Sequence, residues 1–454
     1  MSRPATQHKR ATYPAYRPSG MDWVGDIPEH WEIHRLKHVA SVQFSSVDKH
    51  TLEGEEPVRL CNYVDVYYND FITADIEFMS ASATQSEVAR FQLCRGDVLV
   101  TKDSESWDDI AVPSYVAEKL EGVLCGYHLA HIRPHPRKLL GEYLFRAFRS
   151  RGINDQFRIA ANGITRFGLG KYWLDNGLFP VPSLDEQRAI AAFLDSETAR
   201  IDALIEKKRR QIELLQEKRS ALISHAVTKG LDPHTAMKDS GIDGVGGLPA
   251  HWALKRLKFL TPHVSVGIVI TPSKYYEESG VPCLRSLNVR PDELTENDLV
   301  FISPESNELL RKSKLHAGDV VVVRTGKPGT AAVVDDRFDG ANCIDLIIVR
   351  KSARFDSRFM CYVLNSDFAL AQYIAGTSGA IQGHFNIETA SNMLIPMPPL
   401  EEQVGIRERL DLEVGQLKRL GDKIEESITR LREHRTALIS AAVTGKIDVR
   451  KEAN

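Results

Sequence analysis

The stretch IPEHWEIHRLK, from Ile27 to Lys37, occurs a second time as LPAHWALKRLK, from Leu248 to Lys258. Tryptophan is rare in this chain, with five among 454 residues, so a Pro-x-His-Trp string that returns with its spacing kept is a poor candidate for chance. Repeated strings of this kind indicate an architecture built from two similar units. The sequence therefore predicts two copies of one fold.

The repeat continues through most of the chain. LCRGDVLVTK from Leu93 aligns with LHAGDVVVVR from Leu315, and LFPVPSLDEQRAI aligns with LIPMPPLEEQVGI. The offset between the copies drifts by a few residues at first and is constant from Gly163 and Gly379 onward. Surface loops tolerate small insertions, whereas a regular element does not. Each copy is therefore predicted to be a loop-rich globule followed by a rigid segment.

The rigid segment of each copy has the pattern of a long helix. Apolar residues recur at alternating spacings of three and four, which is typical of a heptad seam that packs against another long helix. Lys208 and Gly421 depart from the apolar pattern. The seam positions are Ile201, Ile205, Lys208, Ile212, Leu215, Arg219, Leu222 and Ala226 in the first copy, and Leu417, Gly421, Ile424, Ile428, Leu431, Arg435, Leu438 and Ala442 in the second. The nearest candidate partner for each helix is the other copy.

The globular part of each copy is predicted to mix α and β structure. Short β-rich runs such as GDVLVTK and GDVVVVRTG alternate with turn signals, and one helix-like stretch is present in each copy. Gly96-Asp97 and Gly318-Asp319 are expected to form a tight turn before a buried strand. The predicted fold class is α+β.

The bulk composition excludes several classes of protein. No apolar run approaches the roughly 18 residues that cross a bilayer, so we expect no membrane association and a cytoplasmic location. The formal net charge of -3 excludes a chain that is strongly basic overall, although a local basic patch can still bind phosphate. The six cysteines are scattered without the close pairs of a zinc or redox site, and are expected to be buried free thiols.

No catalytic motif survives inspection. The fragment VRTGKPG around Lys327 lacks the upstream glycine of a phosphate-binding loop, and Pro328 stands where serine or threonine would bind magnesium. His128, His131 and His135 have a spacing that favours structural or surface histidines over a zinc site. The acidic pairs Asp185-Glu186 and Glu401-Glu402 have the positions of helix starts. An enzyme acting alone, such as a nuclease or methyltransferase, stays an alternative without a supporting motif.

One polar stretch in each copy is a candidate binding segment. ANGITRFGLGKYW from Ala161 and TSGAIQGHFN from Thr377 combine hydrogen-bond donors, flexible backbone and aromatic rings. The copies differ here, since Arg166 aligns with Gln382 and Lys171 aligns with Ile387. Arginine suits guanine and glutamine suits adenine in the major groove, so the pair could read different base sequences. A polar surface turn accounts for the pattern equally well, and both interpretations stay open.

Three motifs occur twice in the same order: the Pro-x-His-Trp string, the Pro-x-Pro-x-Leu-x-Glu-Gln helix start and the ALIS-x-AVT helix end. With these motifs the chain resembles the specificity subunits of type I restriction-modification systems. The resemblance covers nearly the whole chain. It implies two target recognition domains, held by spacer helices that pair as an antiparallel coiled coil, with one part of a split DNA site read by each domain. Helix length is then expected to set the gap between the half-sites.

The same resemblance implies the partners and cofactors. The chain itself would be non-catalytic and bind no cofactor, and its partners would be double-stranded DNA, two methyltransferase subunits and restriction/translocase subunits. The methyltransferase subunits would use S-adenosylmethionine, and the restriction subunits would use ATP and Mg²⁺. A two-headed scaffold that binds only proteins is the alternative function.

The resulting domain prediction is a basic arm (1–12), a first recognition domain (13–183), a first spacer helix (184–233), a second recognition domain (234–399), a second spacer helix (400–447) and a tail (448–454). The candidate DNA contacts are Lys102, Trp107, Arg166 and Lys171 in the first domain, and Arg285, Arg324, Lys327, Gln382 and His384 in the second.

Overall fold

The computed structural model describes residues 10–241, 246–377 and 385–451, and it divides into two compact units. The first unit comprises Met1–Lys208 with Glu426–Asn454, and the second comprises Arg209–Glu425. The division passes through both long helices, α6 (Leu184–Lys229) and α11 (Leu400–Val443). The predicted domain boundaries stay predictions, whereas the mixture of α and β structure and the long C-terminal helix are confirmed.

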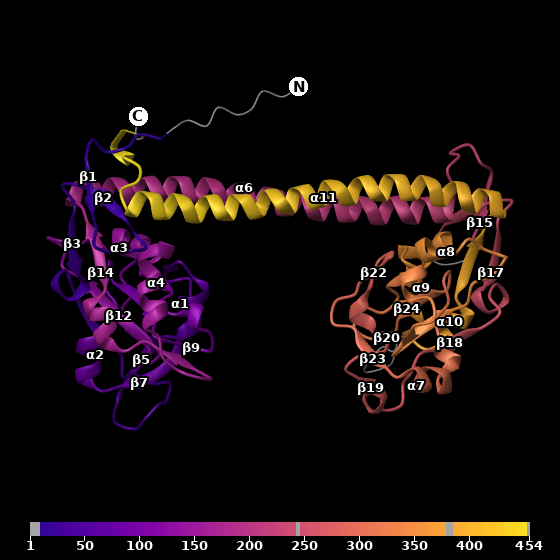
Figure 1. Cartoon of the computed structure of the whole chain (residues 1–454), viewed down its shortest axis with the longest axis horizontal. Coiled ribbons are helices and arrows are strands. Elements are labelled where there is room, and N and C mark those ends of the chain that lie inside the picture. The colour runs from indigo at the N-terminus through magenta and orange to yellow at the C-terminus, as the bar shows by residue number, and fades with distance from the viewer. Residues whose placement is uncertain (1–9, 242–245, 378–384, 452–454) are drawn as a thin grey trace. The chain divides into compact units, whose positions relative to one another are not determined.

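The first unit contains a five-stranded sheet in the order β4-β12-β8-β10-β6 and a three-stranded sheet in the order β11-β5-β7, with helices packed around them (Figure 1). Three further strand pairs are β1-β2, β14-β3 and β13-β9. Its strands are β1 (Tyr16–Pro18), β2 (Asp26–Pro28), β3 (Glu32–Arg35), β4 (Ala40–Phe44), β5 (Glu56–Cys61), β6 (Phe71–Ile72), β7 (Met79–Ala83), β8 (Val98–Thr101), β9 (Asp103–Ser104), β10 (Pro113–Val116), β11 (Val123–Cys125), β12 (Leu129–Pro134), β13 (Phe167–Gly168) and β14 (Leu178–Val181). Its short helices are α1 (Tyr63–Tyr68), α2 (Gln85–Phe91), α3 (Gly141–Phe148), α4 (Arg151–Ala160) and α5 (Lys171–Asn176).

The second unit resembles the first in its main sheet, which has four strands in place of five, whereas its second sheet has four strands in place of three. Its main sheet runs β18-β27-β24-β25 and its second sheet runs β19-β23-β20-β26, with the pairs β15-β16, β17-β28 and β21-β22 beside them. Its strands are β15 (Met237–Asp239), β16 (Gly247–Pro249), β17 (Ala253–Arg256), β18 (Val264–Val266), β19 (Tyr276–Glu277), β20 (Val281–Leu284), β21 (Val289–Arg290), β22 (Glu293–Leu294), β23 (Val300–Ile302), β24 (Val320–Val323), β25 (Ala331–Val333), β26 (Asn342–Cys343), β27 (Leu346–Val349) and β28 (Leu394–Met397). Its short helices are α7 (Pro304–Leu309), α8 (Ser357–Leu364), α9 (Asp367–Thr377) and α10 (Ile387–Asn392).

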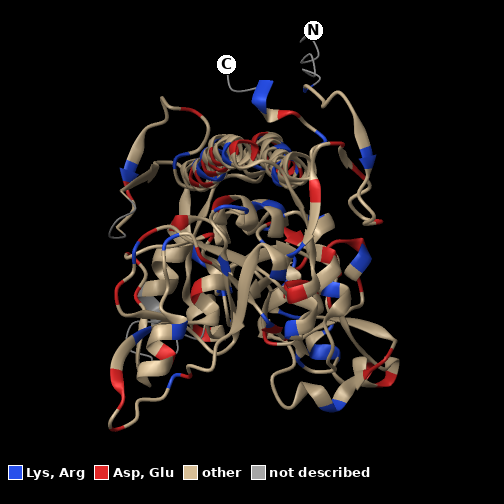
Figure 2. Cartoon of the chain, turned by 90° about the vertical axis from the view of Figure 1, so that its left-hand side faces the viewer, with Lys and Arg blue, Asp and Glu red and all other residues tan. Residues whose placement is uncertain are grey.

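Each unit contains segments of both long helices. In the first unit Arg435 of α11 lies 3.0 Å from the carboxylate of Asp202 in α6. In the second unit Ile223 of α6 and Leu410 of α11 belong to one apolar core together with Trp252. Acidic and basic residues are mixed within both long helices, which Figure 2 shows nearly end-on.

Two arginines that fit the predicted heptad seam also bind the globular part of their own unit. Arg435 forms an ion pair with Asp70 at 3.4 Å, and its counterpart Arg219 forms one with Asp292. A charged group at a seam position is costly unless it is paired, and these two carboxylates supply the partner. The spacing of three and four therefore identified the helix, but not the role of every residue on it.

The repeated Pro-x-His-Trp string forms the joint between globule and helix. In the first unit the carboxylate of Glu186, in the first turn of α6, lies 3.0 Å from the His30 ring and accepts a hydrogen bond from the Trp31 indole at 3.4 Å. In the second unit Glu402 makes the same contacts, at 2.8 Å with His251 and 3.0 Å with Trp252. The acidic residues at the helix starts therefore also bind the two buried tryptophans.

The end of the other long helix completes each joint. Gly445, after α11, packs on Pro28 and Trp31, and a Cβ at this position would collide with the Pro28 ring. Gly230, after α6, lies against Trp252, where a Cβ would be 3.3 Å from the indole. Both glycines have positive φ, at +70° and +75°, which ends a helix without steric cost when no side chain is present.

A buried carboxylate after the Gly-Asp turn anchors each main sheet. Asp97 is 1% exposed and accepts hydrogen bonds from Arg133 at 2.8 Å and from the backbone of Cys94, and it also contacts His131 at 2.7 Å. In the second unit Asp319 pairs with Arg350 at 2.6 Å. Gly96 and Gly318 have φ of +99° and +93°, so the predicted tight turns before β8 and β24 are confirmed.

The expectation of six buried thiols is wrong for one cysteine. Cys94 is exposed, whereas the other five are buried and free. Cys94 lies at the turn before β8, outside the sheet core, because its backbone faces Asp97 and its side chain points outward. Within the described residues, no helix combines the length and hydropathy of a membrane span.

Replacing Glu186 or Glu402 with alanine should destabilise the joint of its own unit by about 1–3 kcal/mol, because the indole N–H of a buried tryptophan loses its acceptor. Urea unfolding followed by tryptophan fluorescence measures the effect. The control is Glu217→Ala on the exposed face of α6, where the paired carboxylate is 64% exposed and should contribute less than about 0.5 kcal/mol. Equal effects at Glu217 and Glu186 would contradict the role of the joint.

The Asp97 ion pair should make the first unit sensitive to acid. Burial pushes the pKa of Asp97 upward, but Arg133 and His131 together hold the pKa below its ordinary value. Because the pKa is lower in the folded state, the ion pair contributes its full stabilisation above the unfolded-state pKa of about 3.9. This stabilisation is lost as the pH falls through the folded-state pKa. Asp97→Asn should therefore flatten the decline of the urea midpoint below pH 4. Parallel declines for both proteins would refute this.

Candidate functional site

The two copies place polar side chains at the same position, where β8 or β24 ends beside the start of β12 or β27. Thr101 pairs with Leu129 in the first copy, and Val323 pairs with Leu346 in the second. The next residues outward are Lys102 and His128 in the first copy, and Arg324 and Asp345 in the second. These four residues therefore occupy equivalent cross-strand positions, although their chemistry differs.

The candidate binding segment of each copy is attached at this position. The backbone N–H of Leu169 donates to the Lys102 carbonyl at 2.7 Å, and the N–H of Phe385 donates to the Arg324 carbonyl at 3.4 Å. The structure thus brings together two features that the sequence presented separately, the end of the buried strand and the divergent polar stretch.

In the first copy, four residues form what we call the first polar cluster: Lys102, Asp103, His128 and Arg166. The Asp103 carboxylate lies 3.2 Å from the Lys102 ammonium and 3.0 Å from His128 Nδ1. The Arg166 guanidinium lies 3.1 Å from the same His128 nitrogen. One carboxylate therefore lies within reach of two basic side chains, and the imidazole nitrogen that it contacts also lies within reach of Arg166.

Lys102 faces inward within this cluster. Its residue is 9% exposed, and its ammonium lies 4.5 Å from the centre of the Tyr127 ring and 5.3 Å from that of Phe44. Cation–π contacts of this kind stabilise a desolvated ammonium. Arg166, in contrast, is exposed, so it is the cation of the cluster that faces solvent.

Arg166 lies on a short hairpin whose base is closed by backbone hydrogen bonds. Asn162 and Gly168 exchange two backbone hydrogen bonds, at 3.1 and 2.9 Å, and β13 pairs with β9. Ile164, at the tip of this hairpin, is 96% exposed. A backbone fixed in this way presents Arg166 and Ile164 outward from a defined frame.

Aromatic side chains flank the first polar cluster. The Tyr63 and Tyr67 rings of α1 are stacked 5.5 Å apart. Burial raises the pKa of both phenols, so both stay protonated and can donate hydrogen bonds near neutral pH.

In the second copy, three residues form what we call the second polar cluster: Arg324, Thr325 and Asp345. Arg324 Nη1 lies 2.6 Å from the Asp345 carboxylate, which also accepts a hydrogen bond from the Thr325 hydroxyl. Asp345 has φ of +52°, a left-handed conformation that is uncommon for residues other than glycine. Lys327, three residues after Arg324, is exposed.

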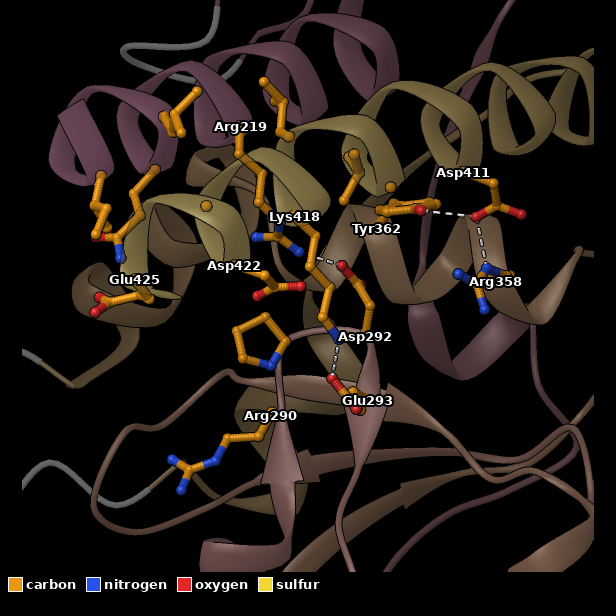
Figure 3. A pocket seen from close by; sticks show the side chains of 18 residues that line it. Arg219, Arg290, Asp292, Glu293, Arg358, Tyr362, Asp411, Lys418, Asp422 and Glu425 are labelled. Carbon is orange, nitrogen blue, oxygen red and sulfur yellow. Dashed lines mark hydrogen bonds and ion pairs between the residues drawn. The ribbon is translucent and has the colours of Figure 1, made fainter. Parts of the chain in front are cut away.

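A cleft of about 550 Å³ lies elsewhere in the second unit, between α6, α8, α11 and the loop at Pro291 (Figure 3). Ion pairs cross it from Arg219 to Asp292 and, at 2.6 Å, from Lys418 to Glu293. Gly421 lines the cleft where the aligned residue of the first copy, Ile205, is buried. The missing side chain leaves this space open.

The predicted contacts fall into three groups. The polar clusters contain three of them: Lys102, Arg166 and Arg324. Two more lie a few residues along the chain from the clusters, Trp107 and Lys327. Lys171 opens α5 and is paired with Asp175 at 2.6 Å, while Arg285 donates to the Asp298 carbonyl. Gln382 and His384 lie outside the described residues.

Sequence reasoning missed the carboxylates Asp103 and Asp345 and the tyrosines of α1. The signal that could have found both carboxylates was their place beside a candidate cation at a strand end. His131, in contrast, is a structural histidine, as favoured from its spacing: it is 3% exposed and bound to Asp97.

Comparison with known proteins bears on this arrangement. Residues 28–214 match the model of the type I restriction modification DNA specificity domain. This stretch of the chain is thus similar to the DNA specificity domain of that family. Over 94% of its length it is 24% identical to the putative type I restriction enzyme MjaX specificity subunit of Methanocaldococcus jannaschii, of which the match covers 96%. The predicted resemblance to type I specificity subunits is thereby confirmed.

Solved structures agree with this fold. A chain from a study of complex assembly and conformational transition of the type I R-M system superposes with a TM-score of 0.66 at 22% identity, over 93% of this chain and 99% of that one. The HsdS subunit of Thermoanaerobacter tengcongensis gives a TM-score of 0.50 at 19% identity, over 93% and 98%.

Proposed function

We propose that this chain is the DNA-reading subunit of a type I restriction-modification complex and carries out no chemistry itself. The supporting observation is the repeated polar cluster at equivalent strand ends, in a chain similar along its length to specificity subunits. Each copy would read one part of a split DNA site. Phosphate contacts would fix register and base contacts would select sequence.

The long helices supply the second part of the proposal. We propose that α6 and α11 pair as one antiparallel coiled coil whose length sets the gap between the half-sites. Leu214, Leu412 and Leu420 on these helices are 48%, 54% and 48% exposed. Exposed leucines on long helices suit packing against a partner, which we propose to be two methyltransferase subunits that use S-adenosylmethionine. Restriction subunits using ATP and Mg²⁺ would complete the complex in the cytoplasm.

Within this proposal the candidate contacts divide by exposure. Arg166 and Arg324 are proposed to approach bases, whereas Trp107, Lys171, Arg285 and Lys327 are proposed to contact phosphates or sugars. Lys102 is proposed to support its cluster from beneath, because its ammonium is enclosed by Tyr127 and Asp103. Gln382 and His384 stay predicted contacts of the second copy.

The function is tested by mapping methylated adenines in DNA from cells that express the chain with its methyltransferase subunits. We expect methylation at one split sequence, and no methylation when this chain is left out. Turnover by the purified chain alone, with Mg²⁺, ATP and S-adenosylmethionine, would overturn the proposal in favour of an enzyme. A complex that shows no sequence preference would favour the scaffold alternative.

Two substitutions should separate base reading from phosphate binding. Arg166→Ala should relax base preference in one half-site only, with a loss of about 1–3 kcal/mol of discrimination. Lys327→Ala should weaken binding to all sequences alike and lower the slope of log affinity against log salt concentration by about 0.9, since one counterion fewer is released. Competition binding at two salt concentrations measures both effects. Relaxed preference in both half-sites for Arg166→Ala would contradict its assignment.

A further inference from the structure

We propose that each copy reads a guanine with one arginine positioned beside a carboxylate near the strand end: Arg324, bound by Asp345, in the second copy, and Arg166, bound by His128 next to Asp103, in the first. This inference rests on the proposed function and adds the specificity-determining pair of each copy. Asp345, Asp103 and His128 are positioning residues in it, because they act through the arginine and contact no base.

The first argument is the equivalence of the two sites. The residues that face each other beyond the Thr101–Leu129 pair are Lys102 and His128. Those beyond the Val323–Leu346 pair are Arg324 and Asp345. The two copies thus use one place in the fold for charged groups while changing their identity. A purely structural ion pair gains nothing from such a change, whereas two readers of different sequences require it.

The second argument is the geometry of Arg324. One nitrogen of its guanidinium is bound by Asp345 at 2.6 Å, and the side chain remains 29% exposed. The guanidinium is planar and has five donors in a fixed fork, so fixing one edge leaves another edge to donate two bonds. Guanine offers two acceptors, O6 and N7, that match this fork in the major groove. Holding the side chain in advance reduces the ordering entropy that binding would otherwise cost.

The third argument is the backbone at Asp345. Its φ of +52° places an aspartate in the left-handed region, which is unfavourable for a residue with a Cβ. Uncommon backbone conformations persist where the surroundings hold them, and they gather at functional sites. Here the conformation directs the carboxylate toward both Arg324 and Thr325.

In the first copy, His128 lies between the carboxylate and the arginine. His128 Nδ1 lies within hydrogen-bond distance of both Asp103, at 3.0 Å, and Arg166, at 3.1 Å. The nitrogen can donate to the carboxylate or accept from the guanidinium, but cannot do both at once. When Nδ1 accepts from Arg166, the Asp103 carboxylate beside it attracts the guanidinium by its charge, and Arg166 keeps other N–H donors for guanine. The backbone hydrogen bond from Leu169, just after the hairpin, to Lys102 keeps Arg166 within reach of this histidine.

The test uses the full chain assembled with its methyltransferase subunits. The probes are duplexes carrying the methylated site found for the wild type, with each base pair of both half-sites replaced in turn. The variants are Arg324→Gln and Asp345→Asn. Asparagine tolerates the left-handed backbone, so Asp345→Asn removes the charge while keeping the conformation. The matched control is Arg337→Gln, an exposed arginine of the same unit that is paired with Asp335 and Glu296.

Arg324→Gln should lower affinity for the original site about 10-fold and shift the preference at one position of one half-site from guanine toward adenine. Asp345→Asn should reduce selectivity at that same position while leaving binding to random duplex unchanged or stronger, because a negative charge near the DNA is removed. Arg337→Gln should change neither. In the first copy, Asp103→Asn should reduce selectivity at the position that responds to Arg166→Ala, in the other half-site.

The outcomes distinguish the two levels of the proposal. A wild-type complex without a split recognition site would overturn the proposed function, and this inference with it. A wild-type complex that selects a split site, combined with unchanged preference at every position for Arg324→Gln and Asp345→Asn, would overturn this inference alone. A uniform loss across all probes for Asp345→Asn would likewise overturn it, because that result identifies a structural ion pair.

Discussion

The carboxylate beneath each buried tryptophan is the interaction on which the rest of this structure depends. Glu186 and Glu402 lie in the first turn of a long helix, yet their oxygens are bound by the histidine and tryptophan of a string more than 140 residues earlier. A carboxylate at a helix N-terminus is favoured by the helix dipole, so the same group stabilises the helix start and fixes the globule to it. This explains why the two motifs recur together.

Each joint also requires the end of the other long helix, and this requirement links the copies. Gly445 packs on Trp31, and Gly230 packs on Trp252, at positions where a side chain would collide with or crowd the ring. A globule that joins the start of its own helix and the end of the other one cannot reach its observed packing from one copy alone. The duplication is therefore a condition of the fold.

The sequence predicted the helices and turns that occur in both copies. It missed the residues whose role depends on polar contacts between distant segments. The heptad spacing indicated two long helices, and the Gly-Asp turns indicated the starts of β8 and β24. Arg219 and Arg435 fitted the seam because periodicity reports only the face of a helix, and the loop carboxylates that pair with them, Asp292 and Asp70, have no pattern of their own. Arg166 and Arg324 were selected for their donors, whereas Asp103 and Asp345 were missed although each lies beside a candidate cation at a strand end.

The two ends of β8 have different roles. Asp97 at the start of the strand supports the sheet, and the cluster with Asp103 after its end carries the proposed recognition residues. Asp97, at the start of β8, is buried and its counterpart Asp319 keeps the same arginine partner in the second copy. At the other end of the strand, the charged groups change between copies and one arginine of each cluster keeps contact with solvent. Four residues of extended strand separate the two ends. A rigid strand with a fixed anchor at one end and variable chemistry at the other allows recognition to change while the core that holds it stays constant.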